Sequence, residues 1–169
     1  FISEFKGDSL EGLRYEQLLA YAQPEDGDAF RVLLGDFVTI EDGTGIVHLA
    51  PSFGADDNRL AKQNGIGSLT LVNRQGKFVD EVTDFAGMYV KDEYYAEGEE
   101  KPKLSVDVQI VIKLKENNLC FKAEKYEHSY PHCWRTDKPI LYYPMDSWFV
   151  KTTDYKTRMM ELNNTINWK

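Results

Sequence analysis

One histidine and two adjacent carboxylates lie within residues 43–57, GTGIVHLAPSFGADD. A carboxylate can fix the orientation of an ammonium group through a charge-assisted hydrogen bond, and Asp57 is the candidate anchor. His48 is a candidate pocket wall, although a lone histidine on a strand is more often a structural residue than a proton carrier. Three residues would let a backbone approach a substrate closely, or would form an ordinary turn: Gly43, Thr44 and Gly45. The segment therefore predicts a small polar pocket.

Other chemistries find less support in the residues. The chain has no Gly-x-Ser-x-Gly elbow, and neither of its two cysteines stands in a recognisable Cys/His frame. His128, His132 and Cys133 invite a zinc interpretation, but Pro131 breaks the helix that a shared metal would need, and a second pair of ligands is missing. We therefore predict no metal site and no covalent nucleophile.

The elements that position the candidate pocket are expected to be strands and one short helix. Residues 30–34, 36–40 and 46–49 are rich in β-branched and apolar side chains, and a glycine turn precedes the last of them. Asp56 or Asp57 is predicted to cap a helix that stops at Asn64 and Gly65. His48 would then lie near a strand end.

The remaining sequence predicts more strands than helices. A hairpin is expected where residues 69–72 and 77–79 flank the turn 73–76, and further strands at 119–124, 140–143 and 147–150. Helical spacing begins at Val106 and ends near Asn117, and Asp154 is predicted to cap a last helix. The fold class expected is α+β, with short helices and a strand-rich, curved or barrel-like sheet.

Composition limits the classes of partner. With 169 residues and 42% hydrophobic content, the chain can bury one sizeable core. A formal net charge of -8 argues against broad nucleic-acid binding. A single nucleotide end could still dock where basic residues gather in the last third, although scattered solvated lysines are the commoner explanation: Lys122, Lys125, Arg135, Lys138 and Lys151.

Cellular context is indicated by what the sequence contains. No stretch approaches the roughly 18 apolar residues of a membrane span. Two cysteines make no disulfide framework, which fits a reducing compartment. The first residues show no initiator methionine and no signal pattern, so we expect a piece of a longer cytoplasmic protein.

Three runs carry a family resemblance that covers nearly the whole chain. Residues 5–15, 43–57 and 130–140, the last followed by residues 147–150, together resemble the editing insertion of isoleucyl-tRNA synthetases. Valyl and leucyl synthetases have a related Gly-Thr-Gly-x-Val start, so an editing domain of either is an alternative. His48 and the run 132–135 look specifically isoleucyl. Asn58 and Leu49 depart from the family pattern.

The resemblance implies a function for the pocket. Asp57 matches the family's amino-group-binding aspartate, and His48 matches the histidine that faces the amino acid side chain and helps to exclude isoleucine. The implied reaction is hydrolysis of valyl-tRNA(Ile), and perhaps of valyl-adenylate, with the acceptor end of isoleucine tRNA as partner. A rival of another class is a non-catalytic module that only binds this acceptor end. A metal hydrolase using His132 and Cys133 is a third.

The resemblance also implies what lies elsewhere. Residues 1–151 would form the editing domain and residues 152–169 an exit segment towards the synthetic core. The family places no metal here, and its Trp134 and Trp148 counterparts are expected to be core or hinge residues. A threonine-rich segment that the family's pocket also uses is not found among these residues. ATP and Mg would belong to the synthetic site of the parent enzyme, and this segment is expected to be inactive alone.

Overall fold

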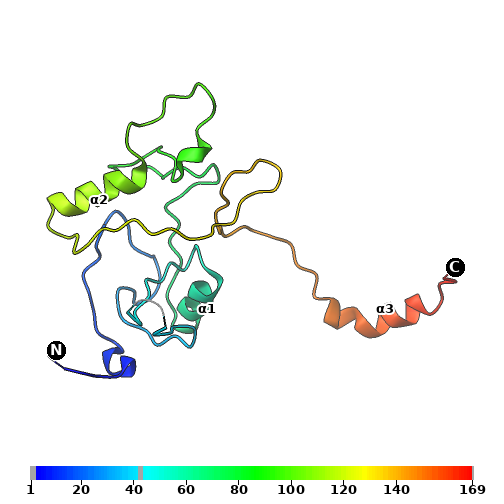
Figure 1. Cartoon of the computed structure of the whole chain (residues 1–169). Helices are drawn as coiled ribbons and strands as arrows, with labels where there is room; N and C mark the ends of the chain where they lie inside the picture. Colours follow the sequence, from blue (N-terminus) through cyan, green and yellow to red (C-terminus); the bar gives the residue numbers. More distant parts are fainter. Residues whose placement is uncertain (1–2, 42–43, 169) are drawn as a thin grey trace.

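The computed structural model describes residues 3–41 and 44–168. In these residues the α-helices are α1 (Ala55–Gln63), α2 (Val106–Glu116) and α3 (Lys156–Asn163). Short 3-10 helices are η1 (Gly7–Leu10), η2 (Asp92–Tyr94) and η3 (Thr152–Tyr155). Figure 1 shows these helices joined by long irregular segments, with α3 far from α1 and α2.

The predicted strand-rich sheet is wrong. The described residues contain no strand, and their antiparallel pairing is limited to isolated bridges, such as Arg14 with Arg31 and Val72 with Phe78. Strand propensity reflects how a side chain fits a pleated, half-buried surface, and it needs a neighbouring segment to supply the ladder. Residues 46–49 lack such a neighbour, and Ile46 is 67% exposed. High β-propensity alone therefore left these segments irregular.

The predicted hairpin is present, although its two arms form no regular strands. The Gly76 amide donates to the Asn73 carbonyl at 2.9 Å, and the Asn73 amide donates to the Lys77 carbonyl at 2.8 Å. Gly76 has φ +79°, a left-handed conformation that favours glycine. Pairing continues to the Val72–Phe78 bridge, and beyond it the Val79 amide donates to the Leu71 carbonyl at 3.1 Å.

All three predicted helices form, although two begin differently from the prediction. In α2 the Ser105 side chain accepts from the Val108 amide at 3.4 Å, and the helix ends before Asn117 as expected. α1 ends in a left-handed turn in which the Gly65 amide donates to Lys62 and the Ile66 amide to Ala61, satisfying its last carbonyls.

The predicted N-caps are corrected. Gly54 is the N-cap of α1, and both Asp56 and Asp57 lie inside its first turn. Tyr155 is the N-cap of α3, because Asp154 lies within the preceding η3 helix. The positions of Asp56 and Asp57 are electrostatically favourable, because the helix dipole stabilises a negative charge in the first turn.

The core is small and lies where α2 meets residues 78–88. Val82, Phe85 and Val106 are buried against one another, and partly buried side chains surround them, including Tyr21 and Ile110. A polar network completes this contact at its edge.

This network joins three segments through one carboxylate. The Tyr21 hydroxyl donates to Asp84 Oδ2 at 2.5 Å, and Lys113 Nζ lies 2.8 Å from the same oxygen. Burial, and then the nearby Asp84, raises the pKa of Tyr21 to about 12. Hydrogen bonds from Lys113 and Tyr21 hold the pKa of Asp84 below its usual value. The network therefore ties α2 to the N-terminal segment.

In the C-terminal third, the expectation of core tryptophans is wrong, whereas a hinge role stays a prediction. Trp134 is 85% exposed and Trp148 is 102% exposed, so neither is a core residue. α3 contacts η3, and no residue of α3 is buried. The boundary near Lys151 stays a prediction. No helix in the described part of the chain is both long and apolar enough to cross a membrane.

Candidate functional site

Asp57 lies in the first turn of α1, where its carboxylate turns back onto the preceding loop. Its Oδ2 accepts the Ala50 amide at 2.9 Å, and the residue is half-buried. A Cβ on Gly54 would lie 2.8 Å from the same oxygen, so the absence of a side chain there permits this close approach. Within the described residues no hydrogen bond engages Oδ1 of Asp57. That oxygen is therefore available to an ammonium group.

Three hydrogen bonds that involve side chains fix the loop between His48 and α1. Besides the Asp57 bond, the Asn58 side-chain amide donates to the Pro51 carbonyl at 2.9 Å. The Ser52 hydroxyl donates to the Leu69 carbonyl at 2.8 Å, and Ser52 is only 4% exposed. Sequence reasoning noted Asn58 only as a departure from the family and missed Ser52. The available signal was one serine directly after Pro51, since a serine hydroxyl in a loop commonly binds a backbone group.

His48 lines a cavity of about 340 Å³ between the end of α1 and the N-terminal segments. Most of the wall is apolar and comes from four stretches of chain: Leu18, Leu19, Phe30, Leu33, Leu49, Pro51, Ala61 and Ile66. Its size falls within the range of about 300–1,000 Å³ typical of ligand pockets. The cavity therefore suits an aliphatic group, with His48 as one of its few polar neighbours.

Gln17 also lines this cavity and was missed from the sequence. Its Nε2 donates to the carbonyls of Leu19 and Ala22, at 3.2 and 2.8 Å, which fixes the orientation of the amide. Its Oε1 is buried and has no partner among the described residues. A buried acceptor without a partner is uncommon. No sequence signal marked it, because glutamine is usually a surface residue.

The glycine turn is only partly described. Gly43 lies outside the described residues. The Thr44 hydroxyl stays local, within 3.4 Å of the Ile46 carbonyl and 3.3 Å of the Ile46 amide, and Thr44 is exposed. Gly45 has φ +74°, which glycine adopts readily. Neither Thr44 nor Gly45 lines the His48 cavity, so the structure places them in a turn rather than in the pocket.

His48 and Asp57, the two principal candidates, are connected through one loop, but they do not line the same cavity. Ala50, whose amide binds Asp57, is two residues from His48, so the bond positions the segment that carries the histidine. Asp57 is not among the residues that line the cavity. A ligand that used both would fill the cavity with one group and reach Asp57 with another.

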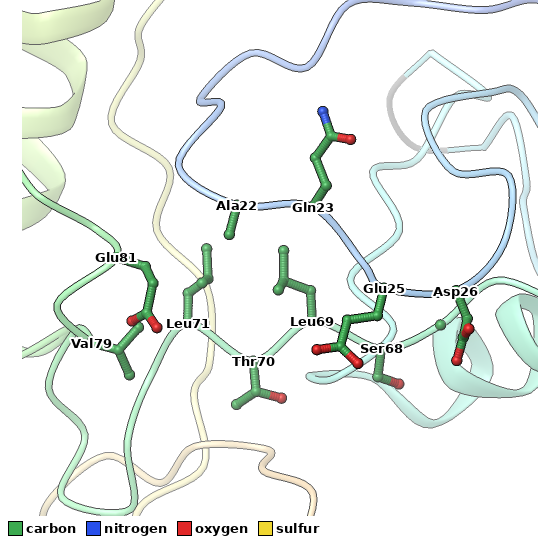
Figure 2. Close-up of a pocket in the computed structure, with 11 residues that line it drawn as sticks. Ala22, Gln23, Glu25, Asp26, Ser68, Leu69, Thr70, Leu71, Val79 and Glu81 are labelled. Atoms are coloured by element: carbon green, nitrogen blue, oxygen red, sulfur yellow. The ribbon is translucent and has the colours of Figure 1, made fainter.

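A second cavity, of about 420 Å³, lies between residues 22–26 and 67–71. Figure 2 shows Leu69 and Leu71 pointing towards Ala22 and Gln23, whereas Thr70 points the other way. Carboxylates on Glu25, Asp26 and Glu81 line it, and it contains none of the predicted site residues. Such an acidic lining would repel phosphate, so it is a poor site for nucleic acid.

The residues of the zinc hypothesis serve other contacts. His128 Nδ1 lies 2.9 Å from the Ser129 carbonyl, and His132 Nδ1 lies 2.9 Å from the Tyr130 carbonyl. Among the described residues, no group of three or more potential ligands is placed to hold a metal ion. Hydrogen bonds from Thr136 and then from the Arg135 backbone lower the pKa of Cys133.

Comparison with known proteins gives many relatives of one kind. An isoleucine–tRNA ligase of Cytophaga hutchinsonii is 57% identical over 187 residues, covering 99% of this chain and 17% of that protein. Proteins of the same name from Bacteroides fragilis and Clostridium acetobutylicum are 48% and 50% identical, again over 99% of the chain. No protein-family model matches.

These matches first place the chain among the aminoacyl-tRNA synthetases. More narrowly, it corresponds to a segment of the isoleucine–tRNA ligases, which confirms the resemblance found in the sequence. The chain spans about one sixth of the length of these relatives, 17% in Cytophaga and 15% in Clostridium acetobutylicum.

Proposed function

We propose that the chain forms part of an isoleucyl-tRNA synthetase and contributes to the editing pocket that hydrolyses valyl-tRNA(Ile). The observation that carries this proposal is the apolar cavity with His48 in its wall, next to a loop bound by Asp57. The parent enzyme would join isoleucine to its tRNA with ATP and Mg at a separate synthetic site, in the cytoplasm.

The chemistry needs no covalent nucleophile, because the substrate is already an activated ester. In this proposal the aliphatic side chain enters the cavity, and the ammonium group binds Oδ1 of Asp57. Water attacks the ester carbonyl, the bond to the ribose oxygen breaks, and free valine and tRNA are released. Fixed orientation of the ester towards water supplies much of the rate enhancement.

Discrimination in this proposal is steric. A synthetic site that accepts isoleucine rejects the smaller valine weakly, so a second, smaller pocket removes the error; isoleucyl-tRNA synthetase is itself the usual example of this logic. His48 would narrow the cavity enough to exclude isoleucine.

The test is deacylation of valyl-tRNA(Ile) by the full-length synthetase carrying Asp57→Ala or Asp57→Asn. We expect deacylation to fall in both variants while isoleucylation stays intact, because both remove the charge that holds the ammonium group. Asp56→Ala is the matched control, since Asp56 is exposed and pairs with Arg59 at 3.0 Å. Unchanged deacylation in both Asp57 variants would refute the editing role and favour a module that only binds tRNA.

A further inference from the structure

An aromatic ladder runs along the segment that leads to the 132–139 bridge. Tyr126, His128, Tyr130 and His132 stand at alternate positions, and each ring lies beside the next one in the row. Consecutive ring centroids are 5.5, 6.2 and 6.2 Å apart, and the first pair is stacked with an interplanar angle of 25°. This is an ordered row of rings rather than a scatter of aromatic residues.

The ladder is open to solvent. Tyr126 is 82% exposed and Tyr130 is 38% exposed, and both histidines are exposed as well. Contiguous exposed apolar surface often marks an interaction site, because burying an aromatic side chain is strongly favourable. The exposed rings can therefore bind a partner that presents flat faces or apolar surface.

Cations beside the ladder indicate which partner. Lys91 Nζ lies 5.2 Å from the centroid of the Tyr130 ring, and the Arg135 guanidinium lies 4.5 Å from that of Trp134, which is also exposed. Rings for stacking beside cations for phosphate are the two components with which proteins bind single-stranded nucleic acid. Glu127 lies in the same segment, at a position between two of the rings in sequence, and is not itself one of the row.

We propose that the aromatic ladder, Tyr126, His128, Tyr130 and His132, binds unpaired nucleotides of tRNA by base stacking. The partner's identity as tRNA rests on the proposed function, whereas the stacking chemistry rests on the rings and cations themselves. Because the overall charge of -8 opposes general binding to nucleic acid, the contact is confined to this local surface. The competing occupant is apolar surface from the remainder of the synthetase.

The experiment measures the Kd of the full-length synthetase for uncharged isoleucine tRNA, with Tyr126→Ala, Tyr126→Leu and Tyr126→Phe. Loss of one stacking ring should raise the Kd about fivefold to 150-fold, so Ala and Leu weaken binding and Phe preserves it. Phe121→Ala is the matched control, because Phe121 is an exposed ring, at 103%, on the same segment but outside the ladder.

A second measurement separates stacking from charge. Arg135→Gln should lower the slope of log K against log salt by about 0.7, the value for one phosphate contact on a single strand, while Tyr126→Leu leaves that slope unchanged. An unchanged Kd in Tyr126→Leu would overturn the proposal, and a lowered thermal midpoint in the same variant would assign the ring to protein packing.

Failure of this proposal is distinguishable from failure of the editing role. Binding of uncharged tRNA does not require hydrolysis, so a ladder that binds tRNA would weaken on Tyr126→Leu even if Asp57 variants deacylate normally. If instead the ladder variants bind normally and the Asp57 variants lose deacylation, editing stands and the ladder does not.

Discussion

The hydrogen bond from the Ala50 amide to Asp57 makes a specific prediction about α1 and its loop. Asp57→Ala leaves that half-buried amide without an acceptor, which costs about 1 to 3 kcal/mol. It also removes a negative charge from the helix N-terminus, worth about 0.3 to 1 kcal/mol. We therefore expect a local destabilisation of about 1 to 4 kcal/mol. Asp57→Asn keeps an oxygen acceptor and should cost only the charge contribution, about 0.3 to 1 kcal/mol.

The assay is hydrogen exchange of the α1 amides, which reports local opening without requiring the whole protein to unfold. Protection should fall most in Asp57→Ala, and much less in Asp57→Asn. The control Asp56→Ala also removes a first-turn carboxylate, but it breaks only the exposed pair with Arg59, so its effect should stay within about 1 kcal/mol. Equal loss of protection in all three variants would refute the reasoning, because charge alone would then explain it.

The same pair of variants decides what Asp57 does for the reaction. If Asp57→Asn holds the loop and still loses deacylation, the charge acts on the substrate. If Asp57→Asn retains deacylation and only Asp57→Ala loses it, the residue acts by positioning the segment that carries His48.

Three further predictions concern other groups. His48→Ala should open the cavity wall, so that the synthetase deacylates its correct isoleucyl-tRNA; unchanged selectivity would remove His48 from the wall. Tyr21 favours its neutral form in the folded state, so its stabilisation is full below pH 10 and is lost as pH rises towards 12; a carbon-13 NMR titration with Tyr21→Phe for assignment measures this, and an ordinary pKa would contradict it. Cys133 should react with iodoacetamide faster at neutral pH than an ordinary thiol, and Thr136→Val should slow it; equal rates would discount the hydroxyl.

Local signals in the sequence predicted the helices well and the sheet badly. The spacing from Val106 and the stop at Asn64 and Gly65 depend on neighbours within a turn or two, so the sequence alone determines them. A sheet forms only where a distant segment supplies backbone groups for pairing. A β-branched run such as 36–40 carries no information about which segment that is. Ile40 is 87% exposed, so its β-propensity did not place it in a buried strand.

The candidate site was predicted at the level of residues, not of contacts. Reading the run 43–57 identified His48 and Asp57, and the comparisons support the family to which that reading pointed. The sequence could not show that Asp57 Oδ2 is already used by Ala50, because that bond depends on how the loop folds back onto α1. Nor could it show Gln17, which reaches the cavity from a segment about 30 residues earlier.

The separation of Asp57 from the cavity limits how a substrate can lie. A valyl group has an apolar branch and a charged ammonium on adjacent carbons, so in the proposed function the branch would enter the cavity while the ammonium would stay outside it, towards Oδ1 of Asp57. The ester carbon is bonded to the same α-carbon and is therefore also held outside the cavity, where water has access. In this proposal, the side chain that is selected by size and the ester that is hydrolysed are both attached to the α-carbon, the first inside the cavity and the second outside it. Changes to His48 should accordingly alter which amino acid is accepted, whereas loss of the Asp57 charge should lower hydrolysis for every amino acid that fits.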